Sequence, residues 1–182
     1  MPVAEANWRR LDTLGEDCCR LIAEPSGWML WGHARFFEAR FGYALDYVVR
    51  CNADRCATGA DNTGVSGGVE VAWKLVKTPV GWRLNDGAPM LSDCTDIDLA
   101  FTPATNILPI CRLEPTSRAE VAAVWFLPEG GGQIERLEQS YTPLGAHRYA
   151  CASPEFEAEL TVDPCGFVTH YPGLWEGETN AP

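Results

Sequence analysis

The stretch Asp93–Leu113 reads DCTDIDLAFTPATNILPICRL, and its order of residues constrains the fold more than any other part of the chain. Its DIDL segment alternates acidic and apolar residues. In an extended chain this alternation points the carboxylates of Asp96 and Asp98 to one face and the apolar side chains to the other. We therefore expect the stretch to begin as a strand.

Two prolines shape the middle of the same stretch. Pro103 and Pro109 each lack a backbone donor and turn the preceding residue away from helical conformation, so no helix is expected across 102–109. The short polar side chains here can hydrogen-bond to nearby backbone and stabilise a non-repeating turn. These side chains are Thr102, Thr105 and Asn106.

Arg112 adds a fixed positive charge to these polar groups. It can hold Asp96 or Asp98 in a bidentate pair, or it can bind an anionic group of a ligand. The first possibility makes the stretch a structural crossover, and we favour it for most of these residues because paired charges are often only structural. The second makes it a ligand-binding site, whose candidate residues are Asp96, Asp98, Thr102, Thr105, Asn106 and Arg112.

Most of the remaining chain alternates apolar and polar residues with a period of two, which is typical of strands with one dry and one wet face. The segment Lys77–Trp82 (KTPVGW) reads as a hairpin turn. Ala119–Leu127 is apolar on both faces, so we place it centrally in a sheet or under a covering element. The clearest alternating segments are Tyr43–Cys51, Gly68–Lys77 and Glu155–Val162.

Three segments are less regular. Asn52–Gly68 is polar and rich in glycine, and we interpret it as a mobile loop or a weak edge strand. In Gly131–Tyr141, apolar residues fit helical spacing as well as a strand. The first twenty residues are the best helix candidate.

These patterns predict one domain, residues 1–182, of the all-β, mainly antiparallel class with few or no helices. A sheet of about ten strands must curl, since strongly twisted sheets seldom stay flat at that size. We therefore expect a curved meander that forms an open half-barrel. Its concave face is a pocket unless side chains fill it, and 7 Trp, 7 Phe and 5 Tyr are enough to line or to fill it.

The composition narrows the possible partners. The net charge of −11 makes nucleic acid a poor partner, and no apolar run is long enough for stable membrane insertion. The N-terminus shows no secretion signal, so we expect a cytoplasmic protein whose eight cysteines are free thiols. The spacing of cysteines and histidines does not favour a metal site, and no cofactor motif is present.

The order D-x-D-L-x-x-T-P-x-T-N-x-L-P-I-x-R-L resembles the signature of a bacterial family known as the putative glycolipid-binding proteins. The resemblance covers about Trp28 to Trp175. It implies a curved half-barrel similar to the Lol-type lipoprotein carriers, and a strand over the ambiguous segment 131–141. The other segments that fit the family are YALDYVVRC with Tyr47 and Cys51, the QSY of Gln139–Tyr141, Tyr149, and VDPCGFVTHYPGLW from Val162 to Trp175.

One position departs from the family pattern, which tends to carry two arginines after L-P-I. The first of these places is Cys111 here, while the second is Arg112. If both arginines hold a ligand head group in the family, this change alters the affinity or the preference of the present chain.

Three functions remain open. The first, which we prefer, is non-catalytic binding of an amphipathic lipid or glycolipid-like ligand in the concave face. The second is an enzyme on a small or lipid-like substrate, with Asp96 or Asp98 as general base and Arg112 on an anion. The third is a protein-interaction scaffold without a small ligand. The second lacks support from any known catalytic motif in the sequence.

Overall fold

The computed structural model describes residues 2–112 and 117–180, and these form one open sheet of fourteen strands. Leu113, the end of the stretch quoted above, lies outside the described residues. The strands are β1 Pro2–Arg10, β2 Gly15–Glu24, β3 Gly27–Glu38, β4 Phe41–Asn52, β5 Ala57–Ser66, β6 Val69–Thr78, β7 Gly81–Leu84, β8 Asp96–Leu99, β9 Ala119–Leu127, β10 Gln133–Gly145, β11 Arg148–Ser153, β12 Phe156–Val162, β13 Val168–Tyr171 and β14 Trp175–Asn180. The helical elements of this part are η1 Ala104–Asn106, α1 Ile107–Arg112 and η2 Glu129–Gly131.

The strand order runs from β7 back to β1 and then from β14 back to β8. Strands β1 and β14 pair antiparallel, with Trp8 opposite Gly177, so the two terminal strands lie side by side in the middle of the sheet. Strands β8 and β9 pair in parallel, while the other pairs are antiparallel. The predicted all-β, mainly antiparallel meander is therefore confirmed. Among the described residues no helix has the length and apolar character needed to cross a membrane.

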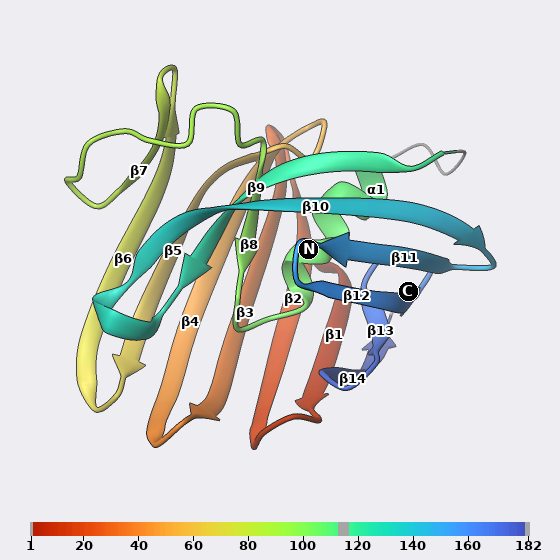
Figure 1. The fold of residues 1–182 in the computed structure, drawn as a ribbon, viewed down its shortest axis with the longest axis horizontal. Helices are drawn as coiled ribbons and strands as arrows, with labels where there is room; N and C mark the ends of the chain where they lie inside the picture. Colours follow the sequence, from red (N-terminus) through yellow and green to blue (C-terminus); the bar gives the residue numbers. More distant parts are fainter. Residues whose placement is uncertain (1, 113–116, 181–182) are drawn as a thin grey trace.

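The sheet curls so that its second half folds over the first, and β9 and β10 cross in front of β4, β5 and β6 (Figure 1). A line of aromatic rings connects the two halves through the interior. Phe101 lies 5.8 Å from Tyr47 of β4 and 6.4 Å from Phe126 of β9, measured between ring centroids. Phe126 in turn lies 5.2 Å from Trp73 of β6. Aromatic side chains thus fill the concave face between the two halves.

Several local predictions are confirmed. Strand β4 buries Tyr43, Leu45 and Tyr47 at alternate positions, as its period of two indicates. The turn between β6 and β7 falls within Lys77–Trp82. The ambiguous segment 131–141 is largely strand β10, as the family resemblance implies.

The prediction of no helix across 102–109 is wrong. Residues 104–106 form η1 and residues 107–112 form α1. Pro103 precedes η1 with φ −79° and ψ −6°, which the proline ring permits. Pro109 lies in the first turn of α1, where a backbone N–H has no partner within that helix.

Two further predictions are wrong. The first twenty residues are strands β1 and β2 instead of a helix, and β2 buries the charged residue Asp17 at one of its inward positions, which masked the alternation. The glycine-rich segment 52–68 contains β5, an interior strand between β4 and β6. A Cβ at Gly59 would lie 2.8 Å from the Leu75 carbonyl oxygen, so this glycine permits close strand contact.

Candidate functional site

Asp96 and Arg112, two of the sequence candidates, form a bidentate ion pair. Both guanidinium nitrogens of Arg112 donate to the Asp96 carboxylate over 2.7 Å, and Thr95 donates to it over 2.7 Å. Asp96 is buried, Arg112 is half-buried, and the hydrogen bonds with Asp96 raise the pKa of Arg112. The pair joins strand β8 to the end of α1.

Thr102 belongs to a second buried cluster. Its hydroxyl donates to the carboxylate of Asp17 on β2, and the Tyr47 hydroxyl on β4 donates to the same carboxylate over 3.0 Å. The Thr102 oxygen also accepts the backbone N–H of Ala104 over 3.0 Å. Burial raises the pKa of Asp17 to about 7, and burial together with Asp17 raises the pKa of Tyr47 well above its usual value.

Asn106 ties the helical segment to strand β10. Its amide oxygen accepts the Tyr141 hydroxyl over 2.8 Å, and its amide nitrogen donates to the Pro103 carbonyl over 3.1 Å. Thr105 accepts the backbone N–H of Leu99 over 3.4 Å. These contacts hold the segment against strands β10 and β8.

Asp98 has a different partner from Asp96. The side-chain amide of Gln139 on β10 donates to its carboxylate over 2.7 Å, and burial raises the pKa of Asp98 to about 6. The six sequence candidates therefore lie along one segment but form four separate contact groups, around Asp96–Arg112, Thr102, Thr105–Asn106 and Asp98. Only Asp96 and Arg112 pair with each other, and a ligand role for the six stays a prediction.

Cys111, at the family position that tends to be arginine, lies near the end of α1. Its thiol donates to the Cys165 carbonyl over 3.2 Å. Within residues 2–112 and 117–180, no group of three or more histidine, cysteine or acidic side chains is placed to hold a metal ion.

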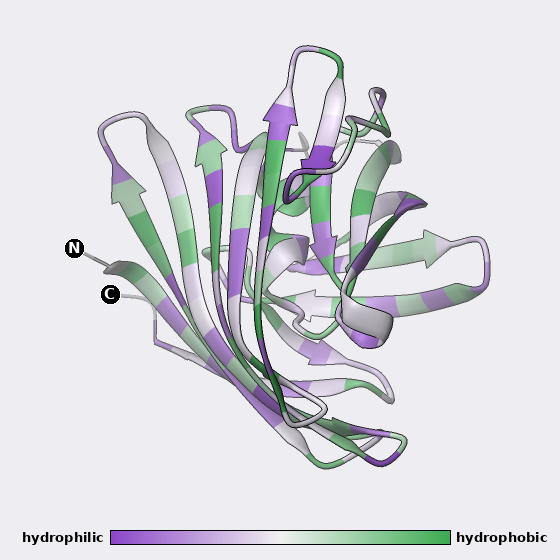
Figure 2. Cartoon of the chain, turned by 90° about the vertical axis from the view of Figure 1, so that its left-hand side faces the viewer, coloured by the Kyte–Doolittle hydropathy of each residue, from purple (hydrophilic) through white to green (hydrophobic). Residues whose placement is uncertain are grey.

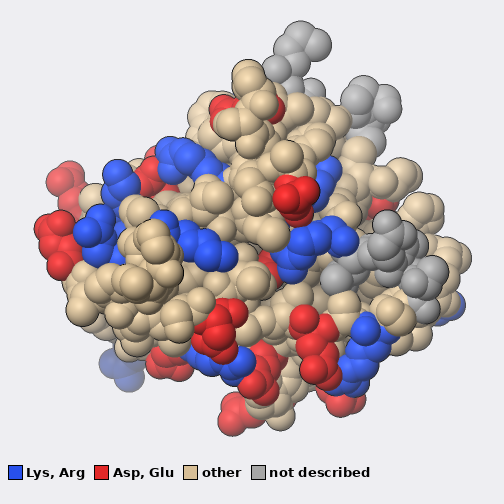
Figure 3. Space-filling model, turned by 90° about the horizontal axis from the view of Figure 1, so that it is seen from above, with Lys and Arg blue, Asp and Glu red and all other residues tan. Residues whose placement is uncertain are grey.

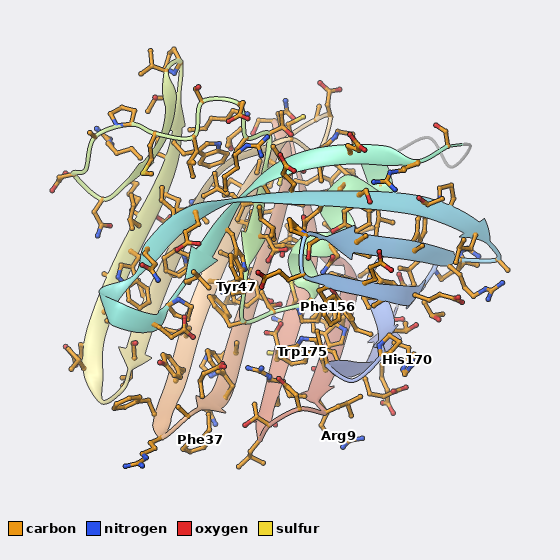
Figure 4. All side chains as sticks on the ribbon, viewed as in Figure 1. Arg9, Phe37, Tyr47, Phe156, His170 and Trp175 are labelled. Carbon is orange, nitrogen blue, oxygen red and sulfur yellow. The ribbon has the colours of Figure 1, made fainter. Side chains whose placement is uncertain are left out.

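A groove of about 910 Å³ lies on the outer face, which we define as the side of β1–β5 and β14 that points away from β9 and β10. None of the six sequence candidates lines it. Figure 4 shows Tyr47 in the interior, whereas Phe37 and Arg9 of the groove lie at the lower ends of the strands. The side chains that line the groove from outward positions are Asn7, Arg9, Leu14, Glu16, Arg35, Phe37, Ala44, Val65, Glu176 and Glu178.

The floor of the groove contains a row of charges that alternate in sign from strand to strand. Cross-strand pairing places Arg35 of β3 opposite Glu16 of β2, Glu16 opposite Arg9 of β1, and Arg9 opposite Glu176 of β14. On its other side Arg35 is opposite Ala44 of β4. Within the described part of the chain, Arg9 and Glu16 form no salt bridge, so their polar atoms remain free for other partners.

The end of the groove next to this row is apolar. The Phe37 backbone N–H donates to the Leu14 carbonyl over 3.0 Å, which brings these two exposed side chains together. Sequence reasoning missed the groove because its residues come from six strands. The adjacent pair Phe36–Phe37 was the available signal. Neighbouring side chains of a strand point to opposite faces, so one of these two phenylalanines has to lie on the outer face, where a polar side chain is expected.

The charged side chains at the opposite end of the molecule are distributed differently. Seen from above, Lys and Arg side chains lie among Asp and Glu with no broad area of one sign (Figure 3).

Comparison with known proteins agrees with the resemblance read from the sequence. The model of the family described as "Putative glycolipid-binding" matches residues 5–177. A crystal structure of a DUF1089 family protein from Pseudomonas aeruginosa is similar, with a TM-score of 0.75 and 30% sequence identity over 88% of this chain and 91% of that chain. No curated protein matches the chain. The chain therefore belongs to the putative glycolipid-binding family.

Proposed function

We propose that the protein binds an amphipathic, glycolipid-like ligand in the outer-face groove and does not transform it. The groove carries this proposal because it combines an apolar end with a charged row whose two middle members, Arg9 and Glu16, form no salt bridge within the described residues. Its volume, about 910 Å³, falls within the range of roughly 300–1,000 Å³ that is usual for small-molecule sites.

The two parts of the groove suit the two parts of such a ligand. Sugar hydroxyls both donate and accept hydrogen bonds, so they fit a row in which Arg9 donates and Glu16 accepts. Leu14 and Phe37 offer apolar surface for the start of an acyl chain. The ligand would lie across the strands, with its head group over β1–β3 and its chain toward the tips.

The concave face, where the sequence predicts the ligand, is a less suitable place for the acyl part than the groove on the outer face. Phe101 is 1% exposed, Tyr47 and Phe126 are fully buried, and the Phe101 ring contacts both of the other rings. A ligand there would have to displace close-packed side chains. We therefore move the proposed site from the concave face to the outer face.

The non-catalytic role and the cytoplasmic setting are parts of the same proposal. The carboxylates that an enzyme would use, Asp96 and Asp98, are occupied by Arg112 and Gln139. All eight cysteines are free thiols, which suits a reducing compartment.

Native mass spectrometry of the protein purified from its own source, followed by organic extraction, tests the proposal. We expect a bound lipid that contains a sugar. The variant Ala44→Phe places a ring in the groove and should lose this ligand, whereas Ala72→Phe puts the same change on an exposed site of β6 outside the groove. A ligand retained equally by both variants would exclude the groove, and a protein that is empty under gentle conditions would contradict lipid binding.

A further inference from the structure

We propose that the tips of three neighbouring hairpins form an edge that docks on a lipid bilayer with zwitterionic head groups. The hairpins are β1–β2, β3–β4 and β5–β6, and we call their joined tips the tip edge. Its exposed apolar residues are Leu11, Leu14, Phe37, Phe41, Val65 and Val69.

The three tips lie at the same end of the sheet and are joined by backbone hydrogen bonds. Phe37 N–H donates to the Leu14 carbonyl over 3.0 Å, which joins the first tip to the second. Gly67 N–H donates to the Gly42 carbonyl over 3.1 Å, which joins the second to the third. Figure 2 shows the tips grouped at the lower end of the sheet, with hydrophobic residues among them.

The apolar side chains of the tip edge are unusually open to solvent. Leu14 is 76% exposed, Val69 66%, Phe41 55% and Phe37 52%. Single exposed apolar residues are ordinary, but a group of them on adjacent turns marks an interaction surface. A bilayer fits such a row of protruding turns because it deforms around them, whereas a protein partner needs a complementary surface.

The charges at the tip edge indicate which kind of lipid head group the bilayer carries. Arg10 pairs with Asp12 over 2.6 Å and with Glu38 over 3.6 Å, and Arg40 follows at the second turn. These four charges cancel, so the β1–β2 and β3–β4 tips are close to neutral in a chain whose net charge is −11. An anionic surface would repel the rest of the molecule, while a zwitterionic one would not.

The tip edge is continuous with the groove, because Leu14, Phe37 and Val65 belong to both. A lipid leaving the bilayer at this edge would keep its acyl chain against apolar side chains on the way to the charged row. This transfer rests on the proposed function, whereas the docking itself does not.

Flotation with phosphatidylcholine vesicles tests the docking. We expect the protein to float with the vesicles, and the variant Phe41→Ser/Val69→Ser to partition about tenfold less, since binding scales with the apolar area buried. Neither residue lines the groove, and both are exposed, so the melting temperature should not change. The control is Val80→Ser/Met90→Ser, which removes two exposed apolar residues elsewhere and should float as the parent does.

Three outcomes would overturn the docking: no flotation of the parent, equal loss in both double variants, or a dimer that only Phe41→Ser/Val69→Ser disrupts. Stronger binding to vesicles that contain phosphatidylglycerol would contradict the preference for zwitterionic lipid. The groove is judged separately, because Phe41→Ser/Val69→Ser leaves its lining intact and Ala44→Phe leaves Phe41 and Val69 in place.

Discussion

The Tyr47 hydroxyl reaches the Asp17 carboxylate, 3.0 Å away, by passing over a glycine on the strand between them. Gly32 of β3 is paired with Tyr47 of β4 on one side and with Cys19 of β2 on the other. A Cβ on Gly32 would lie 2.2 Å from the Tyr47 ring and 2.3 Å from its hydroxyl oxygen. The glycine therefore makes room for a hydrogen bond that spans three strands.

We expect Gly32→Ala to lower the free energy of unfolding by about 1–3 kcal/mol, because the added methyl displaces the Tyr47 ring in a close-packed core. Urea unfolding followed by tryptophan fluorescence measures this loss. Gly42→Ala is the control: its Cβ would meet only the exposed Phe37 ring, at 3.3 Å, and should cost little. Equal stability of both variants would show that Tyr47 can move freely.

Asp17 should make the fold less stable as pH rises. Its pKa is about 7 in the folded protein and 3.8 in the reference state, so the folded protein holds this proton more tightly. Its contribution is therefore greatest below about pH 4 and is lost as pH rises through 7, by on the order of 4 kcal/mol. Asp17→Asn cannot titrate, so the difference in melting temperature between it and the parent should change between pH 4 and 8.

The control for this prediction is Asp98→Asn. Burial raises the pKa of Asp98 to about 6, so its smaller effect should end at lower pH than that of Asp17. A constant difference between Asp17→Asn and the parent across the whole range would mean that the Asp17 carboxyl titrates normally.

The period of two in Tyr43–Cys51 was sufficient to predict strand β4, because its alternation is uninterrupted. Strand β2 was missed because Asp17 occupies a buried position, and hydrogen bonds from Tyr47 and Thr102 compensate for that burial. Those partners are 30 and 85 residues away along the chain, so no local pattern contains them.

The sequence likewise predicted one part of the candidate site and not another. The sequence indicated that Arg112 could pair with Asp96 or Asp98, and the structure selects Asp96. The charged row of the groove could not be predicted, since Arg9, Glu16 and Arg35 become neighbours only through the registers of three strands. Periodicity places a side chain on a face but does not say which residue is opposite it.

Arg112→Ala should destabilise the fold strongly, by about 3–5 kcal/mol, because it leaves the buried Asp96 carboxylate without its charged partner. Arg118→Ala is the control, since Arg118 pairs with Glu120 in an exposed position and should contribute less than about 1 kcal/mol. Thermal unfolding measures both. If Arg112 is a ligand group instead, its variant should lose ligand while its melting temperature stays near that of the parent.

Unlike Arg112, Arg9 and Glu16 should contribute to ligand binding and not to the stability of the fold. Both are exposed, and neither has an ion-pair partner in residues 2–112 and 117–180, so the double variant Arg9→Ala/Glu16→Gln should keep the parent's melting temperature. It should lose most of the ligand seen by native mass spectrometry, because the head group loses a donor and an acceptor in the middle of the charged row. Arg83→Ala/Glu70→Gln, on exposed positions of β7 and β6 outside the groove, should retain the ligand. Both double variants keep the net charge of the parent, so a ligand lost equally from both would show that binding does not depend on the charged row of the groove.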